Sequence, residues 1–284
     1  MNIKTIGLKD ILLKIIEKYN FSMSFLADLL DCSLSYLNLV INGKRTLSKS
    51  YADKLNKYLL DKYNTSLEEI LFSYSDDYFY HGSKLGLVGE INPHYSLDSS
   101  SDFGQGFYIG ESLKQSATFI CDGPHNKGTI YRYSLKTHGL KIKVLKDKEW
   151  VLFIAYNRGL IDFDYDTIDL SNDFKDAINN KYDIIVGDIA DDKMFAVMNM
   201  FFTNAISLEV VIECLKNLGI GKQYCLKTKK ACKALTLIDE IKIDDDLYDV
   251  IYEYTKKMRN TAVESANALI KNARQGTYYA DIIK

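Results

Sequence analysis

Apolar residues recur at intervals of three and four over the first 60 residues, which is the spacing of amphipathic helices. In residues 7–20 these positions are Leu8, Ile11, Leu12, Ile15 and Ile16. Three more helices are predicted after the capping residues Ser24, Ser33 and Ser48. The Asn-Gly pair at 42–43 is expected to end the third helix. Four short helices with a tight turn between the second and third predict a helix-turn-helix layout.

After residue 72 the pattern changes to short β-prone runs separated by helical patterns. The predicted strands are residues 78–80, 106–109, 129–135, 184–186 and 223–226. The predicted helices are residues 111–120, 148–157, 192–202 and 207–218, and residues 244–271 form one long helix or two. This pattern lacks a regular strand-helix alternation, so the predicted class is α+β. We expect three parts, which are residues 1–72, 76–237 and 238–284, the last being a helical C-terminal extension.

Composition and charge narrow the class of protein. The 284 residues are 47% hydrophobic and 26% charged, which is globular and long enough for two domains. The 36 basic and 38 acidic residues give a formal net charge of −2, which argues against nucleic-acid binding over the whole surface. Residues 1–62 carry a net charge of +4, which leaves −6 for the remainder. The charge therefore permits DNA binding by the N-terminal part.

The cysteines and the N-terminus bear on the compartment. The 5 cysteines are scattered without a C-x-x-C pair and are predicted to be free thiols in a reducing compartment. We expect no metal site, because the possible ligands lack ligand spacing. These are Cys214, Cys225, Cys232, His94, His125 and His138. No apolar leader begins the chain, and no run approaches the roughly 18 apolar residues of a membrane span. We expect a cytoplasmic protein without membrane association.

Residues 24–55, SFLADLLDCSLSYLNLVINGKRTLSKSYADKL, resemble the Cro/CI-type helix-turn-helix family. The matching positions are Leu26, Ala27, Ser33, Ser35, Tyr36, Leu37, Ile41, Gly43, Lys44, Arg45, Leu47, Ser48, Ala52, Lys54 and Leu55. The resemblance implies a third helix that presents Ser33, Ser35, Tyr36 and Asn38 to base edges. Phosphate contacts would come from Lys44, Arg45 and Lys49. The alternative is a helical module that dimerises or docks a protein partner.

Two short motifs about twenty residues apart carry the candidate chemistry. Residues 80–83 read YHGS at the end of a β-prone run, and residues 101–108 read SDFGQGFY. Their glycines are interpreted as places where a ligand approaches the backbone closely. The Asp-Phe-Gly triplet at 102–104 lacks the companion motifs of a kinase. The glycine spacing fits neither a dinucleotide fingerprint nor, with residues 221–222, a P-loop.

With IVGDIADD (185–192) and GKQYCLKT (221–228), these motifs resemble the ADP-ribosyltransferase fold over residues 76–237. The resemblance is to an uncharacterised bacterial family in the H-Y-[EDQ] group, to which diphtheria toxin and poly(ADP-ribose) polymerases belong. It implies a split β-sheet core that binds NAD as a substrate. His81 would bond a ribose hydroxyl, the Gly82 backbone would bond the carboxamide, and Tyr108 would stack on the nicotinamide. The other implied NAD-binding residues are Ser83, Gly106 and Phe107.

The third position of the implied catalytic set is Gln223. In many relatives a Glu at this position holds the nicotinamide-ribose 2′-hydroxyl and helps to activate the acceptor. A glutamine can hold the ribose, but it cannot act as a general base. Either the acceptor needs no base, or a carboxylate elsewhere supplies one. The candidates are Glu111, Asp191 and Asp192, although the Asp pair is interpreted first as the cap of the helix that follows.

The two resemblances together imply an NAD-dependent ADP-ribosyltransferase fused to a helix-turn-helix module. It would release nicotinamide and transfer ADP-ribose to a protein or nucleic-acid acceptor. Such a fusion implies a toxin or a defence effector, with DNA or an antitoxin as a further partner. An alternative stays open, in which the chain is a DNA-binding regulator whose second domain senses NAD or another nucleotide without catalysis.

Overall fold

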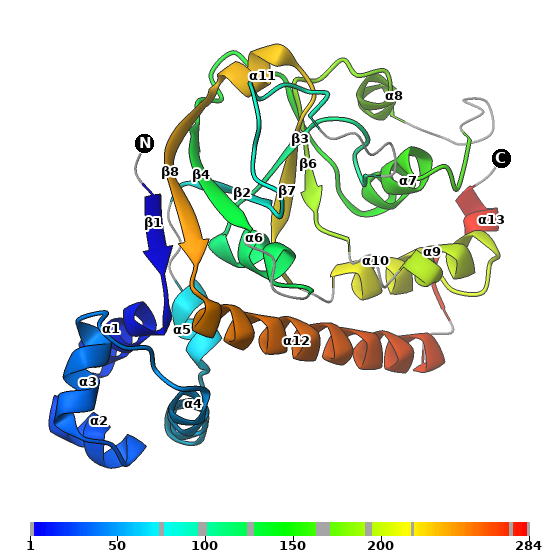
Figure 1. Cartoon of the computed structure of the whole chain (residues 1–284). Coiled ribbons are helices and arrows are strands. Elements are labelled where there is room, and N and C mark those ends of the chain that lie inside the picture. Colours follow the sequence, from blue (N-terminus) through cyan, green and yellow to red (C-terminus); the bar gives the residue numbers. More distant parts are fainter. Residues whose placement is uncertain are drawn as a thin grey trace.

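The computed structural model describes residues 3–73, 77–95, 101–123, 128–162, 171–190, 195–216, 219–272 and 275–282. A helical bundle lies at one end of the molecule, a mixed sheet with helices lies at the other, and a long C-terminal helix runs beneath the sheet (Figure 1). The fold class is α+β, as predicted.

The N-terminal bundle follows the apolar pattern of the sequence. It is made of α1 (Leu8–Tyr19), α2 (Met23–Leu30), α3 (Leu34–Ile41), α4 (Lys49–Tyr63) and α5 (Leu67–Phe72). Ser33 caps α3, because its Oγ accepts from the Tyr36 amide at 3.1 Å. The cap of α2 is Ser22 and not Ser24, since Ser22 Oγ accepts from the Phe25 amide. Helices α2 and α3 are bent by 111° relative to each other, which is within the range of the helix-turn-helix motif.

Eight strands of the described chain form one mixed sheet, in the order β1-β8-β4-β2-β3-β7-β6-β5. They are β1 (Ile3–Ile6), β2 (Phe79–Ser83), β3 (Phe107–Gly110), β4 (Thr129–Leu135), β5 (Ile142–Val144), β6 (Ile184–Asp188), β7 (Lys222–Leu226) and β8 (Leu235–Ile243). The strands β2, β3, β4, β6 and β7 were predicted. The pairs β1–β8 and β5–β6 are parallel, and the other neighbours are antiparallel.

The sheet is nearly divided between β2 and β3. Among the described residues these two strands share the single partner pair Tyr80↔Gly110. By contrast, β2 and β4 pair from Phe79 to Ser83, and β3 and β7 pair over the whole of β3. The two halves, β1-β8-β4-β2 and β3-β7-β6-β5, therefore separate on one side of this pair. A split sheet is what the motif resemblance implies, and the single β2–β3 pair is the feature of the described sheet that bears on it.

Helices cover the sheet and complete the second half of the chain. They are α6 (Leu113–Ile120), α7 (Asp147–Asn157), α8 (Asn172–Ile178), α9 (Phe195–Phe202), α10 (Leu208–Lys216), α11 (Lys229–Lys233), α12 (Asp245–Asn272) and α13 (Tyr279–Ile282). The predicted C-terminal helix is thus one continuous helix, α12. No single helix of the described residues is long and apolar enough to cross a membrane.

The N-terminal bundle and the sheet share one hydrophobic core. A single buried cluster contains Ile11 and Leu26 of the bundle, Ile130 of β4 and Leu247 of α12. Strand β1, which precedes the bundle, pairs with β8 in the sheet. Strand β8 also runs across residue 237, where the helical extension was expected to begin. The bundle is therefore packed into the rest of the molecule and is not joined to it by a free linker.

Candidate active site

A cleft of about 840 Å³ opens where the two halves of the sheet separate. His81 on β2, Tyr108 on β3 and Gln223 on β7 all line it. In the sheet order these three strands are adjacent. The fold thus brings together the three residues that the sequence resemblance assigns to catalysis, although more than 100 residues separate the second from the third.

His81 is held as a neutral ring with a defined tautomer. Its Nδ1 lies 2.6 Å from the carbonyl oxygen of Tyr108, and since a carbonyl only accepts, Nδ1 carries the proton. Burial lowers the pKa of His81, against a smaller raising effect of this hydrogen bond. The ring stacks on Phe107 at 4.5 Å, so Phe107 positions His81. Nε2 is left as an acceptor at the cleft.

Tyr108 is fixed by its own loop. Its hydroxyl accepts from the Phe103 amide at 3.1 Å and donates to the Gly104 carbonyl oxygen. Burial raises the pKa of this phenol, so the group stays neutral. Lys227 ties down the same loop, because its Nζ donates to the carbonyl oxygens of Phe103 and Gln105 at 2.6 and 2.8 Å. The hydroxyl is therefore engaged in structure, and the ring is the part of Tyr108 that is offered to a ligand.

The glycines interpreted above as places of close ligand approach are packed against other parts of the chain. A Cβ on Gly82 would lie 2.9 Å from the carbonyl oxygen of Ser116 on α6. A Cβ on Gly106 would lie 2.3 Å from Cys225 Sγ. Local packing already excludes a side chain at both positions, so the presence of glycine there does not by itself indicate a ligand. Gly82 and Gly106 still line the cleft with their backbone.

Replacing Gly82 with alanine is expected to destabilise the fold by about 2 kcal/mol, because overpacking against helix backbone is not relieved by a side-chain rotation. Denaturant unfolding measures this loss. Gly123→Ala is the matched control, because a Cβ there meets nothing within 4 Å. An equal loss of stability in both variants would contradict the packing explanation.

Two of the predicted residues bond backbone groups outside the cleft. Ser83 Oγ donates to the Gly86 carbonyl oxygen at 2.9 Å, and Ser83 is not among the residues that line the cleft. The carboxylate of Glu111 accepts from the Lys222 amide at 3.0 Å, and Glu111 does not line the cleft either. Asp191 and Asp192, the other candidate bases, lie outside the described residues.

A buried ionic cluster that the sequence analysis did not assign adjoins Gln223. Asp102 is 7% exposed, and its Oδ2 accepts from Gln223 Nε2 at 2.7 Å. Its Oδ1 accepts from Arg158 Nε at 2.9 Å and from a second guanidinium nitrogen. All three side chains line the cleft. The available signal was an acidic residue inside the SDFGQG motif.

Two helices add an aromatic ring and a second arginine to the lining of the cleft, and the sequence reasoning missed both. Phe119 on α6 lines the cleft with half of its surface exposed. Arg259 on α12 lines it too and lies 3.6 Å from Asp122, which also pairs with Lys84. The long C-terminal helix therefore forms part of the candidate site.

The predicted DNA-binding residues lie on α3 and the loop that follows it. Ser33, Ser35, Asn38, Lys44 and Arg45 are exposed, and α2 and α3 lie on the far side of the bundle from the sheet (Figure 1). Tyr36 differs from the expectation. Its hydroxyl donates to the Thr46 carbonyl oxygen at 2.9 Å and accepts from the Ser48 amide, so it shapes the loop.

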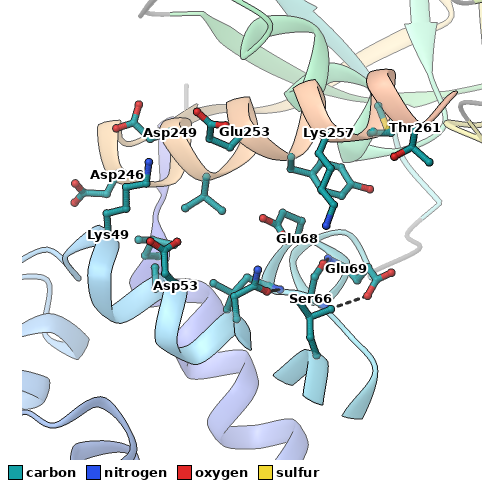
Figure 2. A pocket seen from close by; sticks show the side chains of 18 of the residues that line it. Lys49, Asp53, Ser66, Glu68, Glu69, Asp246, Asp249, Glu253, Lys257 and Thr261 are labelled. Carbon is teal, nitrogen blue, oxygen red and sulfur yellow. Dashed lines mark hydrogen bonds between the residues drawn. The ribbon is translucent and has the colours of Figure 1, made fainter. Parts of the chain in front are cut away.

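Lys49 does not lie with the other predicted phosphate contacts. It lines a separate groove of about 650 Å³ between α4, α5 and α12, which Figure 2 shows from close by. Six acidic residues line this groove, against the two lysines Lys49 and Lys257. They are Asp53, Glu68, Glu69, Asp246, Asp249 and Glu253. A lysine among these carboxylates is not placed to hold a phosphate.

The fold and the site define an α+β protein whose cleft opens at a split in its sheet. Residues 78–237, more than half of the chain, match the family model described as a protein of unknown function (DUF3990). The chain belongs to this family, and the matched segment contains the strands that bear His81, Tyr108 and Gln223. The comparisons with curated proteins and with solved structures found no match.

Proposed function

We propose that the chain is an NAD-dependent ADP-ribosyltransferase. The observation that carries the proposal is the meeting of His81, Tyr108 and Gln223 on adjacent strands in one cleft. A cavity of this size accommodates a dinucleotide-sized ligand. The motif resemblance and the placement of these residues thus support the same function from independent starting points.

The residues of the cleft suit the parts of NAD. Nε2 of His81 accepts from a ribose hydroxyl, because Nδ1 is already committed to Tyr108. The rings of Tyr108 and Phe119 offer flat faces to the nicotinamide, which carries positive charge in NAD. The positive charges of Arg158 and Arg259 favour the negative diphosphate.

In the proposed reaction the bond between nicotinamide and C1′ of its ribose breaks, and nicotinamide leaves with the bonding electron pair. A nucleophilic atom of the acceptor then bonds to C1′ and releases its proton. Gln223 orients the ribose without taking this proton. The carboxylate of Asp102 contacts Gln223 and is ion-paired with Arg158, so it is already engaged by these two side chains. The cleft therefore favours an acceptor whose nucleophile needs no strong base.

NAD labelled in its adenylate part tests the proposal and identifies the acceptor. The purified chain is incubated with the labelled NAD and separate pools of protein, DNA and RNA. Label is expected to become covalently attached in one of the pools, with release of nicotinamide. Binding of NAD without turnover would instead support a regulator that senses the nucleotide.

A second function, DNA binding by the N-terminal bundle, is favoured by a specific observation. The 111° angle between α2 and α3 lies within the range of helix-turn-helix motifs, in which the second helix enters the major groove. The exposed face of α3 carries hydroxyl and amide side chains and no acidic residue. It also exposes Leu34 and Leu39 at 47% and 39%, which would serve the alternative of a protein partner.

Changing Lys44 and Arg45 together to alanine is expected to weaken duplex DNA binding and to reduce the slope of log K against log salt by about 2. Each of these side chains would contribute one phosphate contact. The measurement is a titration with duplex DNA at several salt concentrations. Lys57→Ala with Lys62→Ala is the control, because these exposed lysines lie on α4. If the wild-type chain does not bind duplex DNA even at low salt, protein docking is left as the role of α3.

A further inference from the structure

Gln223 and the buried carboxylate of Asp102 form a hydrogen-bonded pair that fixes the direction of the glutamine amide. The two side chains meet at 2.7 Å between Gln223 Nε2 and Asp102 Oδ2. A carboxylate only accepts hydrogen bonds, so the nitrogen end of the amide has to face Asp102. The oxygen end, Oε1, accepts no hydrogen bond from any of the described residues. Because Gln223 lines the cleft, this oxygen is available to a ligand.

Arg158 supplies the charge that makes the pair stable where it is. Asp102 is 7% exposed, and a buried carboxylate without a cation would be costly. The guanidinium of Arg158 donates twice to Oδ1 of Asp102, which leaves Oδ2 for Gln223. The three side chains together carry no net charge.

We propose that Asp102 is a positioning residue that presents Oε1 of Gln223 to a ribose hydroxyl of the bound dinucleotide. This inference rests on the proposed function. In it, Asp102 and Gln223 together do what a single glutamate oxygen would do, since both present a fixed acceptor to the hydroxyl. The negative charge is then on Asp102, beside Arg158, and Gln223 lies between this charge and the ribose.

The proposal makes a specific prediction for Gln223→Glu. This change introduces the glutamate that many members of the resembled ADP-ribosyltransferase group have at this position. The new carboxylate would lie at hydrogen-bond distance from Asp102, and two like charges there cannot both be ionised. With one shared proton, the acid pair reproduces the wild-type hydrogen bond. When the proton is lost, the two groups repel. The variant is therefore expected to lose about 10-fold in nicotinamide release between about pH 5.5 and about pH 8, relative to wild type.

Exchanging the carboxylate of residue 102 with the amide of residue 223 is expected to rescue the pH profile of nicotinamide release. Asp102→Asn combined with Gln223→Glu keeps one carboxylate and one amide in contact, so its pH profile is expected to return to that of wild type. Asp102→Asn alone leaves the amide of Gln223 without a fixed direction, and the rate is expected to fall about 10-fold. Gln275→Glu adds the same charge at an exposed position outside the cleft, and its profile is expected to match wild type.

Melting temperature is recorded over the same pH range for every variant, as a readout independent of turnover. For Gln223→Glu the folded-state pKa of the acid pair is raised, so its stability relative to wild type is expected to fall as pH rises above about 4.3. Gln223→Glu with a flat rate and a flat melting profile would overturn the proposal while leaving the transferase function standing. A wild type that releases no nicotinamide would overturn the function, and with it the role toward ribose. The pH dependence of the melting temperature of Gln223→Glu would then still test whether the side chain of Asp102 contacts that of residue 223.

Discussion

Replacing His81 with alanine is expected to lower the rate of nicotinamide release from NAD by about 100-fold, which is typical for the loss of one preorganised hydrogen-bonding group in an active site. The ring has a fixed tautomer through Tyr108 and a fixed plane through Phe107. Alanine removes the acceptor Nε2 and leaves a gap beside Phe107. Free nicotinamide measured over time with saturating NAD gives the rate.

His94→Ala is the matched control for this prediction. His94 is exposed and does not line the cleft, so its variant is expected to release nicotinamide at the wild-type rate. A melting curve for each variant separates a loss of chemistry from a loss of fold. The role assigned to His81 would be contradicted by a folded His81→Ala chain that keeps its rate.

Deleting residues 1–72 is expected to prevent the remaining chain from folding into a stable, soluble protein. The deletion removes β1 from the sheet and uncovers Tyr80, Ile130, Ile241 and Leu247, which are buried in the core shared with the bundle. Exposed apolar surface of that extent favours aggregation. Size-exclusion chromatography and thermal melting of the truncated chain check the result.

Two alanine variants on one helix give a graded form of the same prediction. Ile11→Ala is expected to cost about 3 kcal/mol, because Ile11 is 1% exposed, and to shift one unfolding transition of the whole chain. Leu13→Ala on the same helix is expected to cost little, because Leu13 is 43% exposed. A truncated chain that stays monomeric and melts at the full-length temperature would show that the bundle is a separate domain.

Much of the fold could be predicted because the deciding signals are local. The spacing of apolar residues predicted α1. The capping residue Ser33 predicted the start of α3. The strands β1, β5 and β8 were missed, and β1 shows a physical reason. Strand β1 has four residues with three exposed, and its strand character comes from pairing with β8, which no local pattern encodes.

The residues of the candidate site also fall into those that local motifs indicate and those that only the fold brings together. His81, Tyr108 and Gln223 were found because they stand in recognisable motifs, and the sheet does bring them together. The ionic cluster was not found, since it joins Asp102 to residues 56 and 121 positions further along the chain. Arg259 was missed because a solvent-facing arginine on a long helix looks like ordinary surface until α12 is placed against the cleft.

The release of nicotinamide from NAD by the purified wild-type chain tests the central claim most directly. Free nicotinamide is separated from NAD by chromatography and quantified over time, with His81→Ala and His94→Ala measured in parallel. The ADP-ribosyltransferase function predicts that nicotinamide accumulates with wild type and His94→Ala, and that its rate falls about 100-fold with His81→Ala. Wild-type protein that is folded yet neither binds NAD nor releases nicotinamide would contradict it.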